Sequence, residues 1–311
     1  MSRALLLVVA MVGLPSPSAA ETPALIAPKL AGYVQVRETA QENGGLTATL
    51  NRARFSIDGT LPAKFGYRLL TELQASTGAR TPAAVSLREA IVRWAPGAFA
   101  VTAGQFKTPF SREYLLPVPV LETPDFAAVI DSLAPKYDIG AMVEYTWGPL
   151  AAGYLGAFNG EGQNASANRD STVLVVGRIV VRPLAQLALG ASVAHDHGDS
   201  LRWGIEAQAE ERGLMARAEY LARRRPFQDD DFGWYVLGGF RITPQIQIIA
   251  RQEDFQRPAI GTSRRVRATT LGAIIEVAPN RVRLLIDGVR ELAGASQRRM
   301  DSLIGQIQVR F

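Results

Sequence analysis

The segment Arg52-Ala53-Arg54-Phe55-Ser56-Ile57-Asp58-Gly59 alternates polar and apolar side chains without a break. In an extended chain, its charged and hydroxyl side chains fall on one face and its apolar side chains on the other. The apolar residues from Tyr67 to Leu73 continue this pattern on the next segment. Strands of this kind lie between water and an apolar environment, so the chain is predicted to be all-β, with each sheet face in a different solvent.

The connections between predicted strands alternate between short and long. Short turns fall at residues 61–64, 95–98, 148–149, 182–184, 211–213, 242–244 and 278–280. Longer polar connections fall at residues 40–45, 75–84, 160–170, 195–200, 224–231, 256–265 and 291–299. Short turns on one rim and long loops on the other are typical of bacterial outer-membrane barrels, whose short turns face the periplasm. About sixteen strands can be counted, which predicts a transmembrane antiparallel β-barrel wide enough for an aqueous bore.

The composition agrees with strands as the membrane-spanning elements. Mean hydropathy is +0.04, and beyond the N-terminal segment no apolar stretch is long enough to cross a bilayer as a helix. Barrel strands produce no such stretch because each needs only about 9–11 residues and alternates lipid-facing with lumen-facing side chains. The chain has no cysteine, which excludes disulfides and thiolate metal sites. Its 34 cationic and 29 anionic residues are too evenly balanced for a nucleic-acid-binding protein.

The N-terminus has the pattern of a secretory signal peptide. Residues 1–20 contain one cation, Arg3, then the apolar run 4–12, helix-breaking residues and small residues before an acidic one. This pattern predicts cleavage after residue 20, because an uncleaved membrane helix needs about 20 apolar residues without such interruptions. Residues 21–28 are then a lead-in, and residues 29–311 form the outer-membrane barrel domain.

Aromatic residues cluster near the ends of the predicted strands. They are Phe65, Tyr67, Trp94, Phe99, Trp147, Trp234 and Phe240. Aromatic girdles of this kind mark the two membrane interfaces of a barrel. The last strand, residues 303–311, alternates throughout and ends on Phe311. It resembles the terminal aromatic strand of outer-membrane proteins, which the barrel-assembly machinery reads, so Phe311 is expected to act as an assembly signal.

One connection is much longer than the others. It begins with Gly104-Gln105-Phe106-Lys107-Thr108-Pro109-Phe110, and it shows no clear strand or helix period up to Asp138. A loop of this length within a compact protein is usually functional. We expect residues 107–138 to fold into the bore as a constriction loop that sets the selectivity of the pore.

Several stretches resemble the phosphate-selective porin O and P family. They are Arg52-Ala53-Arg54-Phe55, the run from Gly104 to Ser111, Asp138-Ile139-Gly140, Phe158-Asn159-Gly160 and the segment from Arg178 to Pro183. The resemblance extends over most of the chain that follows the signal peptide. It implies a sixteen-stranded homotrimeric porin of the bacterial outer membrane, in contact with its lipid, whose long third loop folds inward.

The strand period predicts a basic wall around the bore. The expected pore-lining cations are Arg52, Arg54, Arg68, Arg93, Lys107, Arg178, Arg182, Arg217 and Arg251, with Arg310 on the last strand. The expected acidic residues of the constriction loop are Glu113, Glu122, Asp125 and Asp131. Charges of both signs across a narrow gap determine which ions a pore admits. This loop carries more carboxylates than cations, so we expect a weak preference for small anions rather than a phosphate-binding site.

A second interpretation of the arginines is structural. They could pair with lumen carboxylates and only solvate a polar interior, because an unpaired and partly buried charge is costly. The candidate partners are Asp58, Glu72, Glu89, Glu144, Glu206 and Glu219. The period of the strands does not decide between selectivity and solvation.

No catalytic, metal-binding or cofactor site is predicted. His195 and His197 flank Asp196 in a predicted polar loop, but their spacing provides no closed set of metal ligands and no nucleophile with an oriented base. Four functions are therefore compared. The first is passive diffusion of small hydrophilic solutes and ions. The others are a loop-plugged barrel that serves as a surface receptor or anchor, an outer-membrane lipid-acting enzyme, and a secreted soluble β protein.

Overall fold

The computed structural model describes residues 27–42, 44–74, 83–196, 200–226, 229–257, 264–293 and 298–311. The predicted signal peptide, residues 1–20, and most of the lead-in at 21–28 lie outside the described residues. His197 lies outside them as well. None of the described helices has the length and apolar content needed to cross a membrane.

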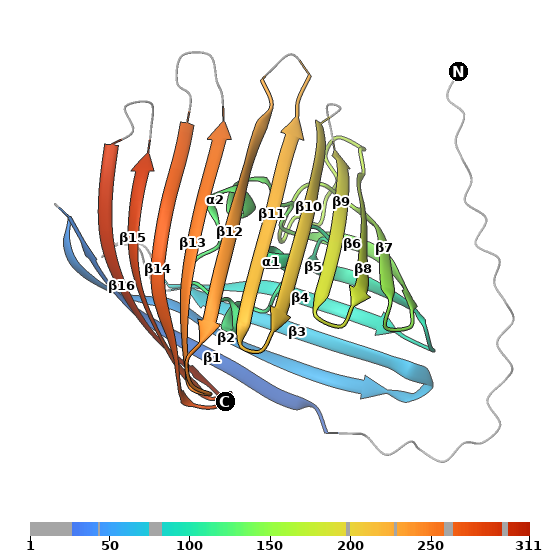
Figure 1. The fold of residues 1–311 in the computed structure, drawn as a ribbon. Coiled ribbons are helices and arrows are strands. Elements are labelled where there is room, and N and C mark those ends of the chain that lie inside the picture. The colour runs from blue at the N-terminus through green and yellow to red at the C-terminus, as the bar shows by residue number, and fades with distance from the viewer. Residues whose placement is uncertain are drawn as a thin grey trace, which may run out of the picture.

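The strands follow one another around a ring in sequence order (Figure 1). They are β1 (Lys29–Gln41), β2 (Gly45–Leu61), β3 (Phe65–Gln74), β4 (Ala84–Trp94), β5 (Phe99–Lys107), β6 (Tyr137–Trp147), β7 (Ala151–Phe158), β8 (Leu174–Leu184), β9 (Leu187–Asp196), β10 (Ser200–Glu211), β11 (Leu214–Arg224), β12 (Asp231–Arg241), β13 (Ile246–Arg257), β14 (Arg264–Ala278), β15 (Val282–Ala293) and β16 (Arg298–Arg310). The described residues form a closed antiparallel barrel of sixteen strands, which confirms the predicted fold.

The ring closes between the first and last strands. Tyr33 of β1 lies opposite Arg310 of β16. Beyond this pair, Gly32 and Phe311 exchange two backbone hydrogen bonds of 3.0 Å each. Closure leaves neither strand with an unpaired edge that could template aggregation. The side chain of the terminal Phe311 is exposed.

The outer face of the barrel is apolar across its middle. On β13 to β16, one row of opposed residues is Ile248, Ala273, Ile286 and Gly305. Toward the rim of the longer loops, a parallel row is Gln252, Thr269, Arg290 and Asp301. Ile248 is 48% exposed and Ile286 is 40% exposed. Exposed apolar side chains bordered by a polar row are what a lipid-facing band requires.

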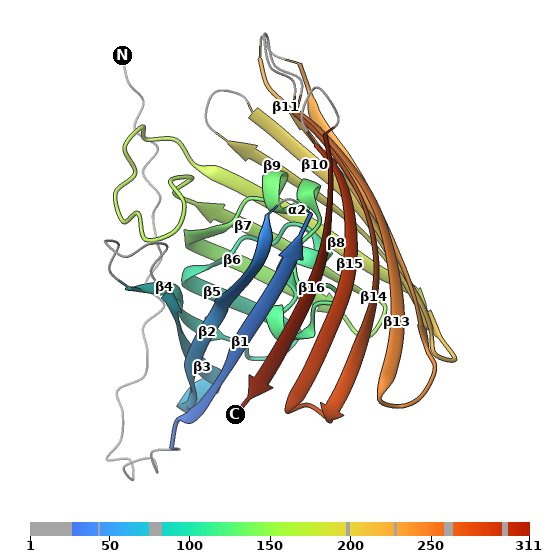
Figure 2. The ribbon, with the colours of Figure 1, turned by 90° about the vertical axis from the view of Figure 1, so that its left-hand side faces the viewer.

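The connection between β5 and β6 lies within the ring of strands (Figures 1 and 2). It contains α1 (Arg112–Leu115), the 3₁₀ turn η2 (Val118–Val120) and α2 (Ala128–Leu133). A further 3₁₀ turn, η1 (Pro62–Lys64), joins β2 to β3. The sequence shows no helix period in the long loop because α1 has only four residues and α2 only six. Ser111 starts α1 by accepting a hydrogen bond from the Tyr114 backbone N–H with its side chain.

The inward connection begins where β5 stops pairing with β4. β5 pairs with β4 only from Val101 to Gln105, whereas it pairs with β6 up to Lys107. The last residues of β5 therefore stay paired with β6 but separate from β4, whose remaining residues pair with β3 alone. Gly104 permits the close approach at this point, because it has φ +122° and a Cβ there would lie 2.0 Å from the Ala90 carbonyl oxygen.

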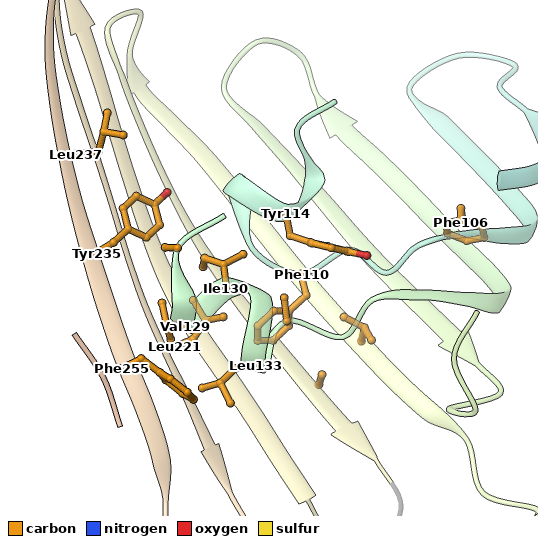
Figure 3. Close-up of a cluster of buried hydrophobic side chains, with 14 of the residues drawn as sticks. Phe106, Phe110, Tyr114, Val129, Ile130, Leu133, Leu221, Tyr235, Leu237 and Phe255 are labelled. Atoms are coloured by element: carbon orange, nitrogen blue, oxygen red, sulfur yellow. The ribbon is translucent and has the colours of Figure 1, made fainter. Parts of the chain in front are cut away.

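The main apolar core lies inside the barrel, between the loop and one part of the wall. Figure 3 shows Val129, Ile130 and Leu133 of α2 facing strand residues that include Leu221 and Phe255. Each of these five side chains is at most 1% exposed. A bore with a polar lining would be expected to hold water, so this dry contact shows that the loop is packed onto β11 to β13 as a core is.

Candidate functional site

Two carboxylates of the barrel wall hold the loop by its helix starts. Glu219 of β11 accepts hydrogen bonds from the backbone N–H groups of Arg112 (3.1 Å) and Glu113 (2.7 Å). Glu253 of β13 accepts one from the backbone N–H of Ala128 (2.7 Å). The first N–H groups of a helix have no partner within the helix, so a wall carboxylate can accept their hydrogen bonds. Its negative charge is also stabilised by the positive end of the peptide dipoles.

A buried ion pair fastens the centre of the loop to β13. Glu113 accepts a hydrogen bond from the Ala127 backbone N–H (3.0 Å) and lies 3.6 Å from the Arg251 guanidinium. Arg251 also donates to the Thr123 hydroxyl (2.7 Å) and the Asp125 carbonyl (2.9 Å). One arginine thus joins several parts of the loop to the wall.

The pKa of Glu113 reflects this burial. Loss of water raises the pKa from 4.5 to about 8, and the positive charge of Arg251 opposes the rise. In the folded protein, Glu113 therefore binds a proton more tightly than in the unfolded chain. By linkage, the stability associated with this group is full below pH 4.5 and falls as the pH rises through about 8.

The other acidic residues predicted for the loop are also engaged in ion pairs. Glu122 accepts from Arg112 at 2.8 Å and lies 3.4 Å from Arg217. Asp125 receives two bonds, of 2.9 and 3.0 Å, from Arg37 of β1. Asp131 pairs with Lys136 at 2.7 Å within the loop, and both side chains are exposed. Glu113, Glu122 and Asp125 therefore attach the loop to the wall.

The stretch from Pro117 to Leu121, here called the lip, is held by its carbonyl groups. Pro119 O accepts from Arg283 Nη1 (2.5 Å), Gln308 Nε2 (3.1 Å) and the Arg310 guanidinium. Before the lip, Lys107 Nζ donates to the carbonyls of Tyr114 (2.6 Å) and Leu116 (2.7 Å). The wall thus fixes the backbone of the lip, where the Pro117 and Val120 side chains are exposed and those of Val118 and Leu121 are buried.

An opening remains between the lip and the strands β1 to β5. Its volume is about 560 Å³, and the cations on its lining are Arg54, Arg68, Lys107 and Arg310. The carboxylate-bearing side chain on the lining is Glu89. With four cationic side chains and one anionic side chain, the lining of this opening has a formal charge of +3.

A second cavity continues toward the rim of the short turns. It measures about 420 Å³ and borders Lys29, Asp58, Arg68 and Arg93. Arg68 borders both cavities, so they meet at its side chain. The lining cations again exceed the carboxylates. The two cavities together describe a basic passage along the inner face of β1 to β5.

The sequence matches the family model described as phosphate-selective porin O and P over residues 31–196, just over half of the 311 residues. The chain belongs to this family. Family and fold together identify a porin, an outer-membrane channel. A comparison with curated protein sequences finds no significant match for this porin.

Solved structures of other porins share the fold. The anion-selective porin from Comamonas acidovorans aligns with a TM-score of 0.70 at 12% identity, over 92% of this chain and 99% of that one. The trimer form of OmpT from Vibrio cholerae aligns with a TM-score of 0.66 at 10% identity, over 92% and 99%. A mutant of the Rh. blastica porin aligns with a TM-score of 0.62 at 15% identity, over 91% and 100%. At these identities the likeness shows the fold alone.

The wall arginines of the porin form many of the pairs that the structural interpretation anticipated. Arg54 lies 2.7 Å from Glu72, Arg68 lies 3.5 Å from Asp58 and 3.0 Å from Glu89, and Arg93 lies 2.8 Å from Glu144. Arg178 pairs with Glu206. The pairs differ in exposure, because the Arg54 side chain is 8% exposed whereas that of Arg68 is 41% exposed. Water reaches Arg68 and hardly reaches Arg54.

The remaining predicted cations occupy other parts of the porin. Arg182 and Arg217 border a cavity of about 200 Å³ on the opposite wall, beside Glu210. Arg52 of β2 lies opposite Gln35 of β1. The Nη1 atom of Arg52 is buried without a hydrogen-bond partner among the described residues. Arg251 is covered by the loop. The structure therefore brings Arg54, Arg68 and Lys107 together at one opening, with Arg93 in the adjoining cavity, and separates the others from it.

Several residues of the porin site were not predicted. Arg88 donates to Glu72 at 2.5 Å, although strict alternation from Arg93 places it on the outer face. The register of β3 and β4 shifts between Leu70 and Thr71, which inserts one residue and reverses the faces beyond it. Arg37 and Arg283 hold the loop, and the strand period of β1 and β15 could have indicated their inward direction.

Of the two histidines of the porin, the structure describes only His195. His195 lies at the end of β9 rather than in a loop. Within the described residues, no group of three or more histidine, aspartate or glutamate side chains is arranged to hold a metal ion.

Proposed function

We propose that this porin is a passive diffusion channel for small hydrophilic solutes and ions, with a weak preference for anions. The observation that supports this preference is the opening beside the lip, where four cations face one carboxylate. A cation-rich and partly desolvated constriction lowers the free energy of an anion relative to a cation of similar size. The similarly folded porin from Comamonas acidovorans is described as anion-selective, which agrees with the proposal.

In this proposal, the charge of the passage replaces the acidic loop as the source of selectivity. The loop carboxylates contribute little field across the opening, because Glu122 and Asp125 are neutralised by arginines and the raised pKa of Glu113 favours its uncharged form. Arg68 and Arg93 contribute most, because they remain exposed to water beside partners that are only partly buried. Arg54 and Lys107 add to the field from the lining.

We further propose the context in which the channel works. The pattern of residues 1–20 fits a signal peptide that is removed on export. The trimer form of OmpT from Vibrio cholerae, which shares the fold, supports a homotrimer. The exposed aromatic Phe311 at the end of the closing strand is available to the barrel-assembly machinery, and the apolar outer rows are suited to outer-membrane lipid.

Replacing Arg68 by Gln tests the proposed source of selectivity. We expect Arg68→Gln to lower the chloride-to-potassium permeability ratio about two- to fivefold, since it removes one water-exposed positive charge next to the passing ion. The matched variant Arg54→Gln should instead destabilise the folded barrel by about 3 kcal/mol, because it breaks a buried ion pair with Glu72.

The measurements are the zero-current potential in a potassium chloride gradient and the urea midpoint of the folded form on unheated gels. An unchanged permeability ratio for Arg68→Gln, with a shift for Arg54→Gln, would overturn this assignment. Absence of any conductance from folded protein would favour the plugged barrel that acts as a receptor or anchor.

A further inference from the structure

One side of the opening is apolar and faces water. Leu115, Pro117, Val118 and Val120 of the loop border it, opposite the cations. Val120 is 41% exposed, and Pro117 is exposed too. Apolar side chains that face water in a bore add no burial energy to the barrel. Their position at the opening suggests that they contact what passes through it.

The apolar side is held rigidly. The wall groups Arg283 and Gln308 bind the Pro119 carbonyl, and Lys107 binds the Leu116 carbonyl. Pro117 and Pro119 restrict φ at alternate positions of the same stretch. The lip therefore cannot easily turn its side chains away from water, and a passing solute meets the same apolar surface each time.

The facing side carries donors for an anion. Arg54, Arg68 and Arg310 border the opening with guanidinium groups, which suit a carboxylate because their N–H groups lie in one plane. Tyr33 lies opposite Arg54 in the register and borders the same space. Its side chain is largely buried at 8% exposure, and its hydroxyl has no hydrogen-bond partner among the described residues. The hydroxyl itself is not accessible from the opening, so the guanidinium groups are the donors that a passing anion meets.

We propose that the opening prefers small organic anions with an apolar body, such as aromatic or branched aliphatic monocarboxylates, over inorganic anions. This inference rests on the proposed channel function. The carboxylate lies toward Arg54 and Arg68, and the body lies against Pro117 and Val120. For a solute of this shape, the free-energy cost of leaving water is lowest here, because its carboxylate meets cations and its apolar body meets the apolar lip.

Inorganic phosphate fits this opening less well. Its oxygens accept hydrogen bonds in all directions, and the lip offers no donor side chain between Pro117 and Val120. The oxygens that face the lip would lose water without a replacement, which costs free energy. The two-sided lining thus separates organic carboxylates from phosphate, although both are anions.

The test is inhibition of chloride current through the purified full chain in planar bilayers. Benzoate, acetate and inorganic phosphate are added separately, and the concentration that halves the current is measured for each. We expect benzoate to act at a concentration about tenfold lower than acetate, since its ring buries apolar area that a methyl group does not. Phosphate should act no better than acetate.

Two variants locate the effect. Val120→Asn should reduce the benzoate-to-acetate ratio about threefold or more, because it removes apolar surface from the lip. Arg68→Gln should weaken block by both carboxylates about fivefold, because it removes one charged donor, while leaving their ratio unchanged. Val173→Asn is the matched control, since Val173 is an exposed valine outside the opening.

The outcomes separate this inference from the channel function. A conducting wild-type channel that benzoate and acetate block equally, or that phosphate blocks best, overturns the preference and leaves the channel function intact. A fall in the ratio for Val173→Asn as large as that for Val120→Asn also overturns it. A folded protein with no chloride current overturns the channel function itself.

Discussion

Deletion of residues 112–133, with a short Gly/Ser linker in their place, is expected to raise the single-channel conductance several-fold and to remove most ion selectivity. The deleted segment contains α1, η2 and α2, and its apolar side chains fill the space beside β11 to β13. Without it, a barrel of this strand number has a wide aqueous bore. Single-channel recording in planar bilayers measures both quantities.

The deletion should leave the barrel folded. Glu219, Glu253 and Arg251 lose their loop partners, but water then enters and solvates them, so no buried unpaired charge remains. Deletion of residues 165–171, in the connection between β7 and β8, is the control and should change conductance little. Equal conductance in the wild type and the 112–133 deletion would show that the loop does not narrow the bore.

Arg251→Met is expected to loosen the loop while the barrel remains closed. Arg251 is 6% exposed, and its removal leaves the Glu113 and Glu253 carboxyl groups without their buried cation. Breaking a buried pair of this kind costs about 3–5 kcal/mol. Backbone amides of the loop, such as those of Ala127 and Ala128, should then exchange hydrogen on the order of 100-fold faster through local opening. Hydrogen exchange followed by mass spectrometry reports this rate for the loop peptides.

A matched arginine on the surface provides the control for this variant. Arg299 pairs with Asp301 on β16, but its side chain is 55% exposed. Water screens a pair as exposed as this one, so Arg299→Met should leave exchange in the loop unchanged. The anchoring role of Arg251 is contradicted if its replacement leaves loop exchange at the wild-type rate.

The architecture could be predicted from local sequence patterns, because the residues of a barrel strand alternate between polar side chains that face the lumen and apolar side chains that face lipid. The alternation at Arg52 to Gly59 lies within β2, and the alternating segment at 303–311 falls on the closing strand and its terminal residue. Alternating short and long connections required no tertiary information. The predicted long loop, 107–138, corresponds to the observed connection between Lys107 and Tyr137.

The arrangement within the bore depends on contacts that no local pattern encodes. Glu113 and Arg251 are 138 positions apart in the sequence. Arg37 and its partner Asp125 are 88 positions apart. The sequence places Glu113, Asp125 and Arg251 in the bore but does not pair them, and it did not identify Arg37. The prediction was therefore an acidic loop separated by a gap from a basic wall. In the structure, acidic loop residues instead pair with arginines, and the opening lies beside the apolar lip.

Local irregularities caused the remaining differences. A single shift of register on β3 and β4 turned Arg88 inward against the predicted alternation. The exposure of each lumen arginine was equally hidden from the sequence, because Arg54 and Arg68 have the same period on adjacent strands. The two side chains lie at different levels of the β2–β3 pair, and their tertiary contacts leave one buried and the other exposed.

The central claim is that ions pass between the lip and the strands β1 to β5, and cysteine accessibility tests it most directly. The chain has no native cysteine, so a single one can be introduced at the exposed Val120 or at the fully buried Val129. An anionic methanethiosulfonate reagent is then added during single-channel recording. We predict that Val120→Cys channels lose current in discrete steps while Val129→Cys channels are unaffected. Block at Val129→Cys and none at Val120→Cys would contradict the claim, because the path would then lie on the other side of the loop.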